Sequence, residues 1–111
     1  MDRALHPIAF AFPGAGIQPS GYEASLLALH ARAMRPCLER CGARVGFDLA
    51  GAADGGFDAL PPLPRQAFTY AYGVGMAEAL RAAGESPAVV AGHSLGVYAA
   101  DVAAGAIGID E

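Results

Sequence analysis

The chain has 111 residues, of which 54% are hydrophobic and 16% are charged, and its formal net charge is −4. This length suits one small domain, and no apolar stretch approaches the roughly 18 uninterrupted residues of a transmembrane helix. The seven basic residues are scattered, which argues against nucleic-acid binding. Because the composition is unusually apolar, we expect part of the apolar surface to meet another surface.

The first predicted element is a buried strand over residues 8–12, an apolar run between two prolines. A turn-rich loop, "PGAGIQPSG", follows it. Helical periodicity then extends over residues 22–43 and is interrupted by Pro36. We therefore expect two helices, the second beginning near Pro36 and ending at Gly42.

The second half of the chain alternates in the same way. A loop with little regular structure is expected over residues 44–64, and an Ala-rich helix over residues 65–83 that Gly84 ends. The stretch "PAVVA" predicts a second short buried strand, and a helix is expected from Ser94 to about Ala104. This order of elements predicts an α/β fold with parallel strands.

The stretch "GHSLG" at residues 92–96 places a serine between two glycines, after the second strand and before the last helix. A serine hydroxyl is a weak nucleophile without a base and oxyanion donors, and a sharp strand-to-helix turn exposes its oxygen. Gly92 and Gly96 provide the room that such a turn needs. Ser94 is therefore the predicted nucleophile. The alternative is a glycine-rich connection with Ser94 as a helix N-cap, which leaves Gly96 unexplained.

The general base that Ser94 needs is missing from this interpretation. Side chains of adjacent residues diverge at such a turn, so His93 is expected to shape the turn as a partly buried, hydrogen-bonded residue. His6 lies near the chain start and His30 lies on the first helix, and neither is placed convincingly as the base.

Cys37 and Cys41 lie four residues apart on one face of a predicted helix. Because no histidine or third cysteine stands at ligand spacing, we interpret them as partly buried thiols and expect no metal site. The chain also has no disulfide framework, and its N-terminus has no long apolar region or cleavage site of a signal peptide. A cytoplasmic location is therefore expected.

Three stretches together resemble a known family: "FAFPGAGIQ" at residues 10–18, Gln66 at the start of a helix, and "GHSLGVYAADVAAGAI" at residues 92–107. They resemble malonyl-CoA:acyl carrier protein transacylases and the acyltransferase domains of fatty-acid and polyketide synthases. The resemblance covers nearly the whole chain but only the N-terminal part of that family's domain. It implies an incomplete α/β-hydrolase-like acyltransferase core with short parallel strands, Ala-rich helices and a nucleophile elbow. Residues 1–111 would be a partial acyltransferase domain, without the ferredoxin-like subdomain and the C-terminal core.

The resemblance also implies an activity. Ser94 would accept a malonyl or related acyl group from a CoA thioester and pass it to the phosphopantetheine thiol of an acyl carrier protein. The backbone N–H groups of Ala15 and Leu95 would form the oxyanion hole. No metal or redox cofactor is implied, because the CoA thioester is itself the substrate.

Further positions carry over from the same family. Gly14 and Gly16 would let the loop approach the thioester closely, and Gln66 would lie near the substrate. Val97 departs from the family, which usually has glutamate there. The family's catalytic histidine and the arginine that pairs with the malonyl carboxylate correspond to positions beyond this chain, so the isolated chain is expected to be inactive and marginally folded.

Two other hypotheses stay open. An esterase-type α/β-hydrolase fragment would also carry G-H-S-x-G, but the H-G-G-type oxyanion loop of those enzymes is missing here. A non-catalytic subunit or relic of a split acyltransferase would explain Val97 and the missing base. In the split case a second chain would supply the missing part.

Overall fold

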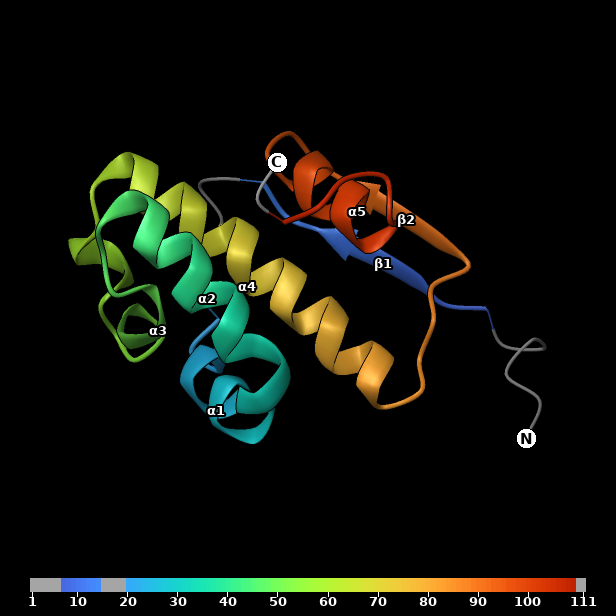
Figure 1. Cartoon of the computed structure of the whole chain (residues 1–111), viewed down its shortest axis with the longest axis horizontal. Coiled ribbons are helices and arrows are strands. Elements are labelled where there is room, and N and C mark those ends of the chain that lie inside the picture. The colour runs from blue at the N-terminus through green and yellow to red at the C-terminus, as the bar shows by residue number, and fades with distance from the viewer. Residues whose placement is uncertain (1–6, 15–19, 110–111) are drawn as a thin grey trace.

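The computed structural model describes residues 7–14 and 20–109 of the chain. Two strands and a set of helices alternate along it (Figure 1). In chain order they are β1 (Ala9–Phe12), α1 (Glu23–Leu29), α2 (Ala31–Val45), α3 (Leu49–Ala52), the 3₁₀ helix η2 (Phe57–Ala59), α4 (Pro62–Ala82), β2 (Val89–Gly92) and α5 (Gly96–Ala103).

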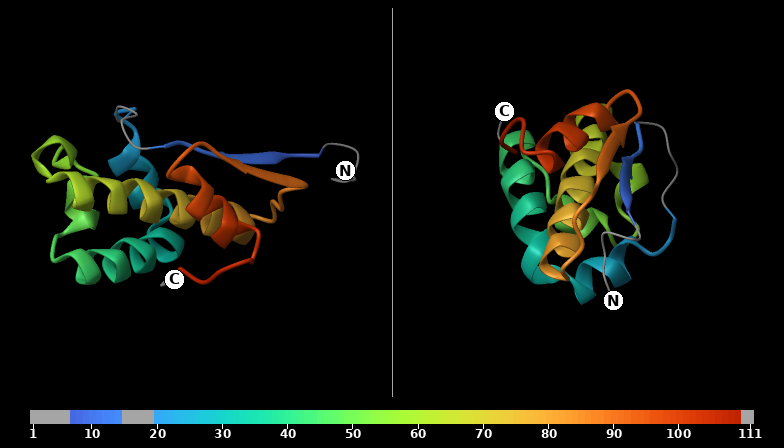
Figure 2. Two further views of the ribbon diagram at one scale, coloured as in Figure 1. Left: turned by 90° about the horizontal axis from the view of Figure 1, so that it is seen from above. Right: turned by 90° about the vertical axis from the view of Figure 1, so that its right-hand side faces the viewer.

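β1 and β2 pair in parallel, with Ala9 opposite Val89 and Phe12 opposite Gly92. Phe10 and Phe12 are buried and pack with residues of α4 and α5, whereas Ala9 is exposed. Figure 2 shows the strands on one side, α4 and α5 behind them, and α2 on the far side of α4. The predicted α/β class and both strands are confirmed. The predicted burial of the second strand is wrong, since most of β2 is exposed.

The break between the first two helices falls at His30, and not at Pro36 as predicted. Pro36 lies inside α2 on its exposed face, where water can bond the Arg32 carbonyl that the proline nitrogen leaves without a donor. The predicted stop at Gly42 is also wrong. Gly42 is buried within α2, and the helix ends at Gly46, whose φ of 77° suits glycine.

The segment of residues 44–64 is more regular than predicted, because it contains α3 and η2. Asp48 caps α3, with the Gly51 N–H donating to its Oδ1 at 3.0 Å. The Arg65 guanidinium donates to the Leu60 carbonyl at 2.9 Å and lies 5.5 Å from the centre of the Phe57 ring. These contacts join the segment to the start of α4.

α4 is the central helix and confirms the prediction of a long Ala-rich helix that ends before Gly84. One side of it packs on α2, where a Cβ at Gly75 would lie 3.1 Å from the Met34 Cα, so glycine permits the close crossing. Its other side packs against β1 and α5 through Val74 and Ala77. No helix among the described residues combines the length and hydropathy of a membrane span.

Candidate active site

Ser94 lies in the three-residue connection between β2 and α5. Among the described residues it is the one non-glycine with a positive φ, 55°. This conformation costs about 1 kcal/mol or more for a residue with a Cβ, so the surrounding structure must hold it. The side chain is exposed, and the N-cap of α5 is Leu95 without a side-chain cap bond. The interpretation of Ser94 as an N-cap is therefore wrong.

Three glycines make this turn sterically possible. A Cβ at Gly92 would overlap the backbone of Gly96, and a Cβ at Gly96 would overlap the carbonyl of Phe12. A Cβ at Gly14 would lie 2.7 Å from the His93 carbonyl oxygen and 3.4 Å from the Ser94 Cβ. The loop after β1 thus packs directly against the turn that carries Ser94.

Backbone hydrogen bonds hold the elbow in place. The His93 N–H donates to the Phe12 carbonyl at 3.1 Å, and the Gly96 N–H donates to the His93 carbonyl at 3.0 Å. The Leu95 N–H has no acceptor among the described residues. It follows Ser94 directly, so it is available to stabilise negative charge that develops beside the serine. Ala15 and Gly16, predicted for the same loop, lie outside the described residues.

The histidines do not supply a base in the described part of the chain. The His93 side chain is exposed, so its predicted partial burial is wrong. Among the described residues it also makes no side-chain hydrogen bond. It packs over Gly14, where an added Cβ would lie 3.2 Å from the ring Nδ1. His30 lies between α1 and α2, as the C-cap of the first and the N-cap of the second, and no element next to the elbow contains it. His6 lies outside the described residues.

Gln66 and Leu95 line a common pocket of about 240 Å³, although they lie far apart in the sequence. The Tyr70 hydroxyl closes one side by donating to the Ile109 carbonyl at 2.8 Å, which holds the segment after α5 against α4. Val97 does not line this pocket and is 44% exposed. All the lining side chains are uncharged: Leu63, Gln66, Ala67, Tyr70, Leu95, Tyr98, Ile107 and Ile109.

Cys37 and Cys41 are buried, and not partly buried as predicted, and they form no disulfide. Burial raises the pKa of Cys37, and the negative charge of Glu78 raises it further. A neutral buried thiol is a poor nucleophile and a poor metal ligand. The described residues hold no cluster of three potential metal ligands.

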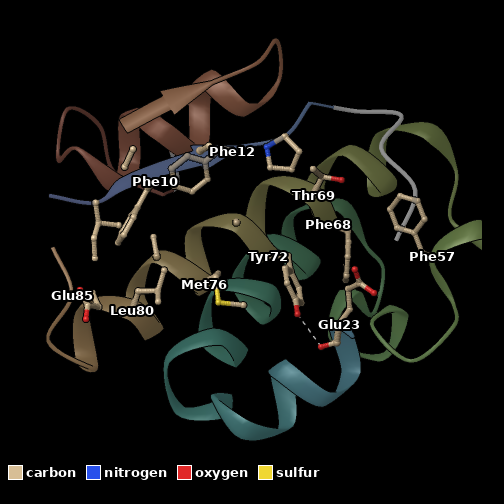
Figure 3. Close-up of a pocket in the computed structure, with 16 residues that line it drawn as sticks. Phe10, Phe12, Glu23, Phe57, Phe68, Thr69, Tyr72, Met76, Leu80 and Glu85 are labelled. Atoms are coloured by element: carbon tan, nitrogen blue, oxygen red, sulfur yellow. Dashed lines mark hydrogen bonds between the residues drawn. The ribbon is translucent and has the colours of Figure 1, made fainter. Parts of the chain in front are cut away.

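The sequence patterns do not reveal a larger groove of about 460 Å³ beside β1 (Figure 3). Its lining comes from β1, from one side of α4, and from Glu23, Phe57 and Glu85. Tyr72 lies in this groove and donates from its hydroxyl to the Glu23 carbonyl at 3.0 Å. The sequence signal that could have revealed the groove is the small residue alanine at alternate positions of β1.

The chain is similar in sequence to several polyketide synthases. It is 37% identical over 116 aligned residues to polyketide synthase GfsB of Streptomyces halstedii, a match that covers 98% of the chain and 2% of the synthase. It is 38% identical over 105 residues to the non-reducing polyketide synthase pks27 of Aspergillus flavus, covering 88% of the chain and 5% of that protein. A 6-methylsalicylic acid synthase of Arthrobotrys oligospora is 49% identical over 47 residues, which are 42% of the chain and 3% of the synthase.

No protein-family model and no solved structure matches the chain. The chain spans 2 to 5% of the length of these synthases. Polyketide synthases contain acyltransferase domains, and the chain is similar to one short stretch of such synthases.

Proposed function

We propose that this chain is the nucleophile-bearing part of an acyltransferase domain that acts in polyketide synthesis. The observation that carries the proposal is Ser94, held at a positive φ in a strand-to-helix turn where three glycines exclude other side chains. The similarity to polyketide synthases supports it. In this proposal the fold is the first part of an α/β-hydrolase-like acyltransferase core.

The reaction proceeds in two steps. The Ser94 Oγ attacks the thioester carbonyl carbon of an acyl-CoA, the C–S bond breaks, and CoA leaves as its thiol with the proton from the serine. The thiol of a carrier-protein phosphopantetheine then attacks the acyl-serine, its proton returns to Ser94, and the acyl thioester is released. The Leu95 N–H stabilises the oxyanion in both steps, and Ala15 is proposed as the second donor.

The proton of Ser94 needs a base, and none of the described histidines bonds to it. The proposal therefore takes the base, and the arginine that pairs with a malonyl carboxylate, from residues outside these 111. Malonyl is the proposed acyl group, an acyl carrier protein is the proposed partner, and Gln66 is a proposed contact to the substrate.

A cysteine at position 94 tests the elbow without the missing base, because a thiol is nucleophilic at mildly alkaline pH. Ser94→Cys is incubated with malonyl-CoA, and the acylated residue is located by peptide mass spectrometry. Ser86→Cys, on the exposed loop before β2, is the matched control. We expect the thiol of Ser94→Cys to be acylated roughly tenfold or more faster than that of Ser86→Cys, because the oxyanion donor acts at the elbow alone.

Equal rates at the two positions would contradict the proposal. Addition of pantetheine then distinguishes the enzyme classes. Transfer of the acyl group to pantetheine supports an acyltransferase, whereas faster release as free acid supports an esterase.

A further inference from the structure

The groove beside β1, called here the β1 groove, lies on the side of that strand away from β2. β1 and its flanking residues, from Ile8 to Pro13, form one wall, and no residue of β2 lines the groove. Met76 and Leu80 of α4 form part of the floor, with Phe68 and Tyr72 further along (Figure 3). A long apolar floor therefore runs alongside a strand edge.

Within the described part of the chain, the backbone of β1 has hydrogen-bonding groups on this side that no other strand pairs. The carbonyls of Ile8 and Phe12 accept hydrogen bonds from Ala88 at 2.8 Å and from His93 at 3.1 Å, so the even-numbered residues face the second strand. Backbone groups alternate in direction along a strand. Those of Ala9 and Ala11 therefore point toward the groove. Among the described residues β1 pairs with β2 alone.

The chemistry of the groove indicates what would occupy it. Unpaired N–H and C=O groups along a strand edge favour another strand over a helix or an apolar small molecule. The small side chains of Ala9 and Ala11 leave that edge accessible. The carboxylates of Glu85 and Glu23 stand at opposite ends of the groove in Figure 3. An occupant with basic residues at its two ends would therefore complement the charge of these carboxylates.

We propose that the β1 groove binds an extended peptide strand from outside this chain, which pairs with the outer edge of β1. Its side chains are apolar at alternate positions and basic at its two ends. β1 has four residues, so the paired part of the occupant is about four to six residues long. This inference concerns a different surface from the elbow and is independent of the acyl transfer proposed for Ser94.

The direct test titrates the chain with a fluorescein-labelled peptide, Lys-Val-Thr-Val-Thr-Val-Lys, and measures fluorescence anisotropy. We expect saturable binding that weakens when both lysines are replaced by glutamate. The same peptide N-methylated at alternate residues loses one row of donors and should bind about tenfold or more weakly. This comparison of peptides requires no protein variant to fold.

Ala9→Pro and Val90→Pro form a matched pair of protein variants, because the backbone groups of each residue point away from the other strand. Ala9→Pro removes an N–H from the groove side and should weaken peptide binding about tenfold. Val90→Pro removes the equivalent group from the other edge and should leave binding unchanged. Circular dichroism checks that both variants fold.

Three results would overturn the proposal. The first is equal affinity for the N-methylated and unmodified peptides, and the second is equal affinity of the two proline variants. The third is a dimer in sedimentation experiments that Ala9→Pro abolishes and that the peptide does not displace, since a second copy would then be the occupant. Ser94→Ala should bind the peptide as the unsubstituted chain does, which keeps this test separate from that of acyl transfer.

Discussion

At Ser94 the positive φ of 55° is held by packing that only glycines allow on either side. The replacement Gly96→Ala brings a Cβ onto the Phe12 carbonyl and forces the elbow to move. We expect it to lower the free energy of unfolding by about 1–3 kcal/mol, as overpacking does. We also expect it to remove the rate advantage of a cysteine at position 94. Urea denaturation and the acylation assay measure the two effects.

Gly105→Ala is the control for that substitution. Gly105 has a positive φ of 80°, whereas Gly96 has none, and a Cβ at Gly105 would meet no atom within 4 Å. It should cost about 1 kcal/mol through the backbone alone and leave acylation at position 94 unchanged. An equal loss of acylation in both variants would show that general destabilisation, and not the elbow, controls the rate.

Tyr72 gives the structure a pH dependence in the alkaline range. Burial raises its pKa from 10.0 to about 12, and the charge of Glu23 adds to the shift. When folding raises the pKa of a phenol, its stabilising effect is fully present at pH values below the pKa of the phenol in the unfolded chain. We therefore expect stability to fall as the pH rises from 10 toward 12. Denaturant unfolding at a series of pH values measures this loss.

Tyr72→Phe separates that titration from other alkaline effects. It removes the hydroxyl that donates to the Glu23 carbonyl at 3.0 Å, which should cost about 0.5–1.5 kcal/mol at neutral pH. The variant should show a smaller decline between pH 10 and 12. If the free energy of unfolding declines equally in both proteins, Tyr72 does not cause the alkaline loss of stability.

Among the elements, α3 depends on one capping side chain in a segment that the sequence indicates to be a loop. Asp48→Ala removes the acceptor of the Gly51 N–H and should cost about 1 kcal/mol. Asp54→Ala, an exposed aspartate in the same segment, should cost less than about 0.5 kcal/mol. The thermal unfolding midpoints of the two variants measure how much the cap stabilises the protein. Equal midpoints would contradict a stabilising cap.

The elements that the sequence predicts well are those in which pattern and packing agree. The strand over 8–12, the long helix α4 and the stop at Gly84 all follow from local periodicity and glycine. Pro36 misleads because its effect depends on whether water can bond the carbonyl four residues earlier. That exposure is a tertiary property.

The candidate site, like the fold, can be predicted from the sequence only in part. Ser94 and its flanking glycines follow from a local motif, because the steric demand of the turn is local. The shared pocket of Gln66 and Leu95 follows from the packing of α4 against the segment after α5. The exposure of the second strand could not be predicted, because its apolar run is equally typical of a buried strand.

At the scale of the whole molecule, the sheet is small for the apolar surface that surrounds it. Its two strands are open on one face, and large apolar side chains such as Tyr22, Leu29 and Val89 are 59% or more exposed. Two parallel strands are a marginal sheet by themselves. We expect the 111-residue chain to have a free energy of unfolding below about 5 kcal/mol. Urea denaturation tests this, and a cooperative transition well above that value would contradict it.

The central claim, that Ser94 is an acyl-accepting nucleophile, is tested most directly on the native serine with a base supplied from solution. The chain is incubated with malonyl-CoA with and without imidazole, and the modified residue is located by peptide mass spectrometry. We predict a malonyl ester at Ser94 whose formation increases with imidazole and which Ser94→Ala abolishes. Acylation that is spread over other exposed hydroxyls, or that persists in Ser94→Ala, would contradict the claim.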